Sequence, residues 1–90
     1  MIYEVETTRE GKARDISFDP SGAVVSVEDE VALESLPAAA RSAIERGAAG
    51  GKIALVERVT EGSQVKYEAH ITKGTKKSEV EVKADGSAAK

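Results

Sequence analysis

Apolar and polar residues alternate along most of this chain with the period of two that half-buried strands require. Glycine, proline and aspartate mark the turns between the alternating stretches. The pattern predicts six strands, at residues 2–8, 13–18, 24–27, 53–59, 65–71 and 76–82. Because short turns join neighbouring strands, consecutive strands should run antiparallel.

Between residues 35 and 47 the apolar spacing changes to three and four, which predicts a helix. Ser35 can cap this helix, and Pro37 is tolerated in its first turn. The glycines from Gly47 to Gly51 should end it. The stripe expected to face the sheet is Leu36, Ala39, Ala40, Ala43, Ile44 and Gly47. Its small residues predict a close approach of the helix to the sheet.

The predicted fold class is therefore α+β. We expect an antiparallel six-stranded sheet, in the order β-β-β-α-β-β-β, with one helix packed on one face. The order of strands across the helix stays open, and a cystatin-like sheet wrapped on a helix is the alternative architecture. The aromatic residues Tyr3, Phe18 and Tyr67 fall on the core face. The outer face is predicted to carry Glu4, Glu6, Asp15, Ser17, Lys66, Glu68, His70, Thr72, Lys77, Glu79 and Glu81.

The chain also repeats itself after 64 positions. Residues 3–22 align with residues 67–86 without a gap, and both apolar and charged positions are preserved. The identical pairs are Tyr3 and Tyr67, Glu4 and Glu68, Thr8 and Thr72, Lys12 and Lys76, and Gly22 and Gly86. We interpret this as one duplicated unit. The alternative is chance similarity between two amphipathic hairpins.

The composition argues against several classes of function. The 16 acidic and 13 basic residues give a net charge of −3, which offers no electrostatic attraction for nucleic acid. The chain has no cysteine and one histidine, so neither a disulfide, a catalytic thiolate nor a structural zinc site is expected. No apolar run is long enough to span a membrane.

The remaining chemical motifs are weak. The run from Gly47 to Lys52 joins a helix to a strand, the reverse of a phosphate-binding loop, and is interpreted as helix termination. His70 has no evident nucleophile beside it, and its counterpart in the repeat is Glu6. The acidic stretch Glu28-Asp29-Glu30 is interpreted as a solvated connection, with weak calcium binding as the alternative. We therefore predict no catalytic residue, no metal and no cofactor.

Four successive segments resemble the PepSY-like proteins, which are small exported bacterial domains. They are Ser35-Leu36-Pro37-Ala38-Ala39, Gly50-Gly51-Lys52-Ile53, Val65-Lys66-Tyr67-Glu68 and Ala84-Asp85-Gly86. The resemblance implies one domain over residues 1–90, in which residues 35–86 form a complete unit and residues 2–28 form the later part of a first unit. It also implies a fold like that of the β-lactamase-inhibitor proteins, with helices on one face of an antiparallel sheet.

Two departures from the family pattern matter. The helix and strand expected before Ile2 are absent from the sequence, and the strand expected after Gly86 is reduced to Ser87-Ala88-Ala89. The inhibitor proteins bind through an aromatic-rich sheet face, whereas here the aromatic residues lie on the expected core face. Inhibition of β-lactamase is therefore not implied.

The sequence thus predicts a noncatalytic domain of undefined role, periplasmic or secreted by resemblance, that binds a protein or peptide. The binding face would hold Glu68, His70, Thr72, Lys77, Glu79 and Glu81. The alternative is a structural module that assembles without a separate ligand. A bare sheet edge left by the absent segments would favour a homodimer.

Overall fold

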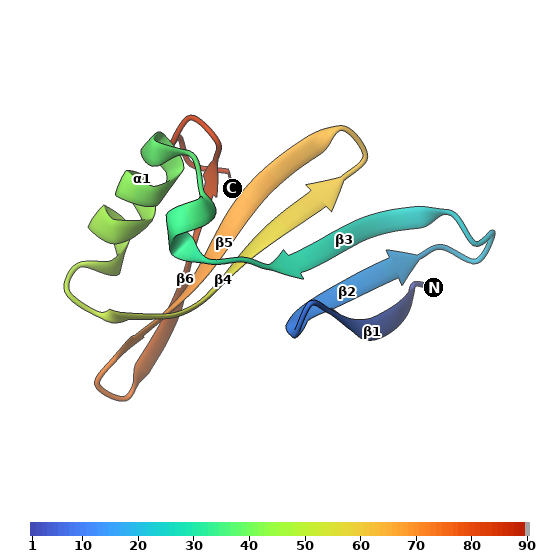
Figure 1. The fold of residues 1–90 in the computed structure, drawn as a ribbon, viewed down its shortest axis with the longest axis horizontal. Helices are drawn as coiled ribbons and strands as arrows, with labels where there is room; N and C mark the ends of the chain where they lie inside the picture. Colours follow the sequence, from blue (N-terminus) through green and yellow to red (C-terminus); the bar gives the residue numbers. More distant parts are fainter. Residues whose placement is uncertain (90) are drawn as a thin grey trace.

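A computed structural model of the chain describes residues 1–89. Its six strands form one antiparallel sheet and follow one another in sequence order (Figure 1). They are β1 (Tyr3–Arg9), β2 (Lys12–Phe18), β3 (Val24–Glu30), β4 (Lys52–Glu61), β5 (Gln64–Lys73) and β6 (Lys76–Lys83). The α-helix of the described chain, α1 (Ala38–Ala48), follows a short 3-10 helix, Leu33–Ser35, between β3 and β4. The predicted fold class is confirmed, and the strand order left open by the sequence is sequential.

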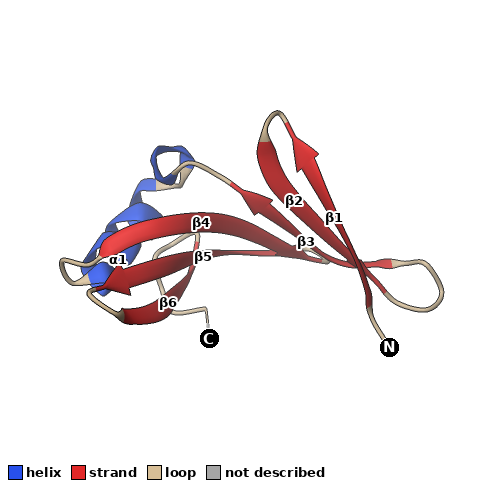
Figure 2. Ribbon diagram, turned by 90° about the horizontal axis from the view of Figure 1, so that it is seen from below, coloured by secondary structure: helices blue, strands red, loops and turns tan. Residues whose placement is uncertain are grey.

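The hydrophobic core lies between α1 and the β4–β6 half of the sheet. Figure 2 shows the helices on one side of the sheet, over this half only. The core residues are Leu36, Ala40, Ile44, Ala48, Val56, Ala69, Ile71 and Val82. Ile44 is fully buried at its centre. The helix therefore covers one half of the sheet and leaves the other bare.

The helix begins later than the sequence predicts. Ser35 lies in the 3-10 helix, where its hydroxyl donates to the Ala32 carbonyl at 2.6 Å, and Pro37 is the residue that precedes the first helical turn. The predicted serine cap is wrong, because the helix begins three residues later, after the Leu36-Pro37 pair.

The buried residues of the helix end at Ala48, and Ala43 also packs against the core. Gly47 faces β6, where an added Cβ would lie 2.9 Å from the Val80 side chain, whereas Ala39 is exposed. The predicted stripe is confirmed except at Ala39, and Ala48 is an additional buried member.

The acidic stretch at residues 28–30 is not a solvated connection. It forms the end of β3 and pairs with β4, where Glu28 lies opposite Val59 and Asp29 opposite Arg58. Asp29 is only 8% exposed, because Arg14 from β2 and Arg58 from β4 bind its carboxylate at 3.0 and 3.2 Å. A neighbouring arginine on each side lets this carboxylate occupy a strand.

Two hairpins of the sheet have the same register 64 residues apart. Tyr3 pairs with Phe18 in the first, and Tyr67 pairs with Val82 in the second. The turn that follows is also the same, with the amide of Gly22 bonded to the Asp19 carbonyl at 2.9 Å and that of Gly86 bonded to the Lys83 carbonyl at 2.9 Å. An isolated antiparallel bridge then joins Val82 to Ala88, at the position equivalent to the pairing of Phe18 with Val24.

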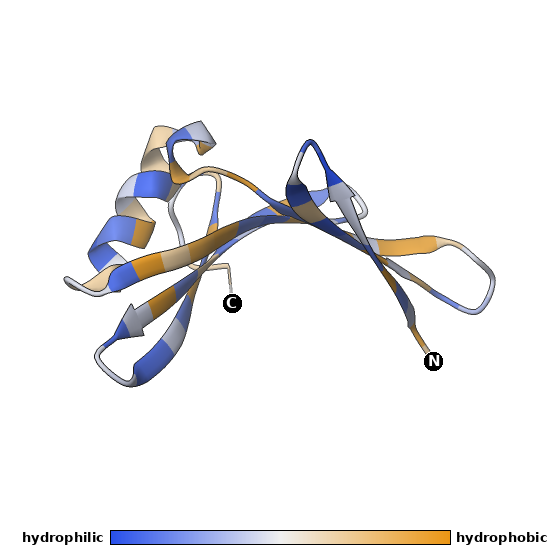
Figure 3. Ribbon diagram, turned by 60° about the horizontal axis from the view of Figure 1, so that its bottom comes forward, coloured by the Kyte–Doolittle hydropathy of each residue, from blue (hydrophilic) through white to orange (hydrophobic). Residues whose placement is uncertain are grey.

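The expected burial of the core face holds for β4–β6, is reached only in part in β2 and β3, where Ile16 and Phe18 of β2 are half-buried, and is wrong for β1. Tyr3 and Val5 share a face with Phe18 and Ile16, yet they are 52% and 47% exposed. Figure 3 shows apolar ribbon in this half of the sheet, at the end of the molecule far from the helix. The reason is that α1 extends over β5 and β6 and does not reach the first hairpin (Figure 1).

Candidate functional site

The face of the sheet opposite α1, called the outer face below, gathers ten of the 16 acidic residues. Directly paired residues of adjacent strands lie on the same face, so the strand registers identify its members. The acidic members are Glu4, Glu6, Asp15, Glu28, Glu30, Glu57, Glu61, Glu68, Glu79 and Glu81. The basic members are Lys52, Lys66, Lys77 and Lys83, with His70 beside them. Acidic groups therefore outnumber basic groups on this face.

A row of carboxylates crosses the middle of the outer face. Glu57 on β4 pairs with Glu68 on β5, which pairs with Glu81 on β6. Lys66 lies beside this row, with its ammonium 2.8 Å from a Glu81 oxygen and 3.7 Å from a Glu68 oxygen. The bond to Glu81 raises the pKa of Lys66 above its ordinary value. One lysine thus offsets only part of the negative charge of the row.

The surroundings of two carboxylates on this face destabilise their charged form. Burial, and secondarily the negative charges of Glu57 and Glu68, raises the pKa of Glu28. Burial also raises the pKa of Glu68, with the charge of Glu81 as the next cause. Like charges directly opposite one another on a sheet destabilise the fold. The outer face therefore carries a negative field that an approaching cation would relieve.

His70 lies between two carboxylates. Its Nε2 is 3.2 Å from a Glu57 oxygen, and its Nδ1 is 3.4 Å from a Glu79 oxygen. Both contacts are with carboxylates, so the arrangement contains a proton acceptor on each side of the ring and no activated nucleophile. The two contacts fix the orientation of the imidazole ring within a charged surface.

Two groups on the outer face have the donor atoms that a cation needs. The donors of Glu57, Glu68 and His70 lie within 4.8 Å of one another, and so do those of Asp15, Glu28 and Glu57. Glu57 belongs to both groups, so the acidic row is continuous from β2 to β5. Zinc prefers nitrogen and oxygen ligands at about 2.0–2.2 Å, so these side chains would have to draw together to hold it.

The structure brings together four of the six residues predicted from the sequence. Glu68, His70, Glu79 and Glu81 meet at the middle of the outer face. Thr72 and Lys77 pair with each other nearer the end of the β5–β6 hairpin and line a shallow depression of about 520 Å³ with His70 and Glu79.

The sequence prediction missed Glu28 and Glu57, which link the acidic row across β3 and β4. Glu28 was assigned to a connection, and the alternation around Glu57 is interrupted by a register shift between Ile53 and Leu55. A signal in the sequence could have placed Glu57 on the outer face. Glu57 alternates with Val56 and Arg58, and this alternation becomes visible when the predicted strand is extended to Glu61.

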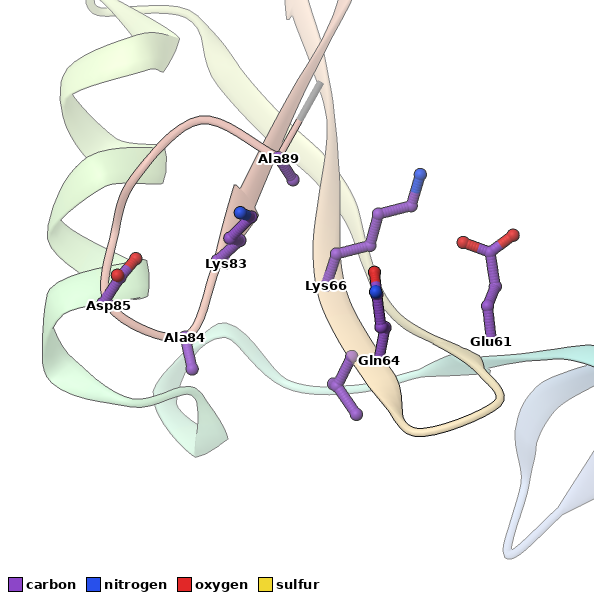
Figure 4. A pocket seen from close by; sticks show the side chains of 8 residues that line it. Glu61, Gln64, Lys66, Lys83, Ala84, Asp85 and Ala89 are labelled. Atoms are coloured by element: carbon purple, nitrogen blue, oxygen red, sulfur yellow. The ribbon is translucent and has the colours of Figure 1, made fainter.

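A separate hollow of about 490 Å³ lies between the start of β5 and the turn after β6 (Figure 4). Charged side chains surround it together with small apolar ones. Its lining residues are Glu61, Gln64, Val65, Lys66, Lys83, Ala84, Asp85 and Ala89. Lys66 connects this hollow to the acidic row, because the same ammonium binds Glu81.

Comparison with known proteins gives a result at the level of fold. No family model matches the chain, and no curated protein is similar to it in sequence. A candidate periplasmic protein of Bacteroides eggerthii superposes with a TM-score of 0.90 over 99% of this chain and 68% of its own, at 18% identity. A BLIP-like protein of Bacteroides fragilis gives a TM-score of 0.81 over 99% of this chain and 65% of its own, at 17% identity. The fold is BLIP-like.

A DUF2874 family protein of Bacteroides ovatus shares this BLIP-like fold, with a TM-score of 0.84 over 99% of this chain and 67% of its own, at 18% identity. The chain thus spans about two thirds of each of these structures. Identities this low establish the fold and leave the function to be argued from the residues. No helix within residues 1–89 has the length and apolar character needed to cross a bilayer.

Proposed function

We propose that this chain is a noncatalytic, exported domain of PepSY-like type that binds a positively charged segment of another protein through its outer face. The observation that carries the proposal is a set of neighbouring carboxylates across β2–β6, in which burial raises the pKa of Glu28 and of Glu68. The set is Asp15, Glu28, Glu57, Glu68 and Glu81. The binding surface comprises Glu28, Glu57, Glu68, His70, Thr72, Lys77, Glu79 and Glu81.

Electrostatics favours a basic partner over a neutral one. Each lysine or arginine placed against Glu57 or Glu68 would remove repulsion between directly paired carboxylates as well as form an ion pair. Aromatic and arginine anchors, which supply most of the energy at tight interfaces, are not among the outer-face residues. We therefore expect fast, salt-sensitive association of modest affinity.

Export and domain organisation belong to the same proposal. The similarity to a candidate periplasmic protein of the same fold supports a periplasmic or secreted location. The shared register of the two hairpins supports two units, a partial one over residues 2–28 and a complete one over residues 35–86. The short bridge at Ala88 supports the interpretation of residues 87–89 as the remnant of a strand.

The test uses an extended peptide of alternating lysine and threonine as the probe, with a glutamate-threonine peptide of the same length beside it. Amide chemical shifts of the full chain should change at Glu57, Glu68 and Glu28 with the lysine peptide only. The double variant Glu57→Gln/Glu68→Gln should weaken binding by about two- to thirtyfold, since each close charge pair contributes roughly 0.2–1 kcal/mol at partly exposed sites.

The matched control is Glu10→Gln/Glu34→Gln, which removes two charges away from the outer face. This control should bind like the unaltered chain. Equal weakening in both double variants would mean that net charge alone drives the interaction, and the proposed surface would then be wrong.

A second candidate function is assembly without a separate ligand, favoured by the exposed apolar face of β1–β3. The edge of β1 could pair with another chain, as bare edges do. Pairing of β1 with its own copy would bring Glu4 and Glu6 against acidic residues of the second chain, so it is less favourable than pairing with a basic strand. Sedimentation equilibrium at high concentration distinguishes a dimer from a monomer.

A further inference from the structure

We infer that Glu57, Glu68 and His70 form a binding site for a zinc ion on the outer face of the sheet. Their donor atoms, an oxygen from each carboxylate and a ring nitrogen, lie within 4.8 Å of one another. A set that combines imidazole nitrogen with carboxylate oxygen is typical of zinc sites. The inference goes beyond the function proposed above and does not depend on it, although both use the same face.

The pairing of β4 with β5 brings the three side chains together. Glu57 lies directly opposite Glu68, and His70 follows Glu68 by two residues, so all three belong to one face. His70 is therefore a diagonal neighbour of Glu57, within the reach of long side chains across a sheet. The site is built on the two longest strands of the described chain and involves no loop.

The distance between two of the donor atoms already suits zinc. His70 Nε2 lies 3.2 Å from a Glu57 oxygen. Two ligand atoms bound at about 2.0–2.1 Å in a tetrahedral site lie about 3.3 Å apart. An ion bound by both atoms would therefore need little movement of either side chain, and Glu68 would turn toward it. Water would complete the tetrahedron, since three protein ligands leave a position open.

The surroundings of His70 favour a cation beside its ring. Nε2 faces Glu57, and Nδ1 lies 3.4 Å from a Glu79 oxygen. A neutral imidazole has one N–H, so it donates to one of these carboxylates and turns a lone pair toward the other. With the proton on Nδ1, the lone pair of Nε2 faces the negative oxygen of Glu57. A metal ion bound by both atoms would remove this repulsion.

Glu79 has the position of an outer-shell partner. Histidines that bind a metal donate their other ring N–H to a carboxylate, a carbonyl or water, which fixes the tautomer and the orientation of the ring. The Glu79 carboxylate beside Nδ1 would do this for His70. Both residues also line the shallow depression of about 520 Å³ on this face, with Leu55 beside them. The depression gives an ion a path to the ring.

The charge of the site matches one divalent cation. The side chains of Glu57 and Glu68 are only 14% and 18% exposed, so solvent ions screen their repulsion less than at an open surface. Within residues 1–89, the ion pair of Glu57 is with His70. Lys66 lies nearer to Glu81 than to Glu68. Calcium and magnesium prefer about six or more oxygen ligands, so two carboxylates and an imidazole favour zinc.

The test titrates the full chain with zinc chloride and follows the imidazole by NMR. His70 is the only histidine of the sequence, so its ring resonances report on this site alone. Zinc should bind as a single ion, shift the nitrogen resonance of Nε2 and leave Nδ1 protonated. Magnesium chloride at the same concentration should leave both ring resonances in place, because magnesium prefers oxygen to imidazole nitrogen.

Substitutions separate the ligands from the general charge of the face. Glu57→Gln and His70→Gln should each weaken zinc binding by at least about tenfold, a loss that outer-shell substitutions alone cause at metal sites. The matched control is Glu4→Gln on β1, at the repeat counterpart of Glu68. It should change the zinc affinity by less than about twofold, because salt screens a distant exposed charge. Calorimetric titration measures the affinities, and amide spectra show that each variant is folded.

Three results would overturn the inference. They are a titration in which zinc does not bind, zinc binding that leaves the ring resonances of His70 unchanged, and equal weakening by Glu4→Gln and Glu57→Gln. The last two would mean that the general negative charge of the outer face attracts the ion. The lysine peptide is titrated in the presence of a chelator, so failure of the zinc site and failure of the peptide surface remain distinguishable.

Discussion

At the scale of single residues, Gly22 and Gly86 form a matched pair in which one structural difference can be measured. Both adopt positive φ, so alanine at either position costs about 1–2 kcal/mol of backbone strain. At Gly86 the new methyl group would also collide with the Ala39 carbonyl at 2.7 Å. We expect Gly86→Ala to destabilise the protein by a further ~1–3 kcal/mol relative to Gly22→Ala, measured by urea unfolding.

The comparison has a clear contrary outcome. If the two alanine variants unfold at the same urea concentration, the turn after β6 moves away from α1 freely and the close approach does not constrain the helix. Gly50 provides a third variant that should behave like Gly22→Ala, because its φ is +86° and a Cβ added there would meet no atom within 4 Å.

Glu28 makes stability depend on pH in a predictable direction. Burial, and then neighbouring carboxylates, raises its pKa in the folded state. Its contribution therefore favours folding below the unfolded pKa and is lost as pH rises through the folded pKa. Glu28→Gln removes the penalty of the charged form, so it should stabilise the protein at pH 7 by about 0.2–1 kcal/mol.

The same substitution should have little effect below about pH 4, where the carboxyl is already protonated. Unfolding in urea at pH 3 and pH 7 measures the difference, and Glu34→Gln, at an exposed position of the 3-10 helix, is the control. Stabilisation of equal size at both pH values would contradict an electrostatic cause.

At the scale of elements, the stability of the fold depends on one helix. Ile44 is the largest fully buried side chain and lies at the middle of α1. We expect Ile44→Ala to cost about 2–5 kcal/mol, as for other fully buried aliphatic residues. Val24→Ala, in the exposed part of β3, should change stability by less than about 0.5 kcal/mol. Thermal unfolding of the two variants measures both; a small effect at Ile44 would mean that the helix contributes little.

The elements themselves could be predicted from the sequence because their signals are local. Alternation identified all six strands, and the three-four spacing identified α1. The extent of β3 could not be predicted, since Glu28, Asp29 and Glu30 read as a polar connection until Arg14 and Arg58 are brought to Asp29 by pairing of distant strands.

The same limit explains which residues of the candidate site could be predicted from the sequence. Glu68, His70, Glu79 and Glu81 lie on one hairpin, so alternation alone placed them on one face. Glu28 and Glu57 join them only through the pairing of β3 with β4, across the 21-residue helical connection from Val31 to Gly51. Contacts made across such a connection leave no local pattern, and neither does the absence of a helix above β1–β3.

At the scale of the whole molecule, only one half of the sheet packs against a helix. The molecule extends 43 Å along its longest axis against 28 and 26 Å along the others, and the core residues lie in α1 and its flanking segment, β4, β5 and β6. The β3–β4 junction has four registered pairs. Asp29 strengthens it by binding Arg14 of β2 and Arg58 of β4 at once. Its carboxylate therefore connects the half without a helix to the half that contains the core.

This arrangement predicts that the first hairpin opens without global unfolding. Amides of β1 and β2 should exchange with solvent faster than those of β5, because few apolar contacts must break to release them. Asp29→Asn should widen the difference by about 1 kcal/mol, since both arginines remain partly in water and the ion pairs are correspondingly weakened. Native-state hydrogen exchange measures both effects, with Asp19→Asn as a charge-matched control in an exposed turn. Uniform protection across all six strands, unchanged by Asp29→Asn, would mean that the sheet unfolds as one cooperative unit and that the bare half gains its stability directly from the core.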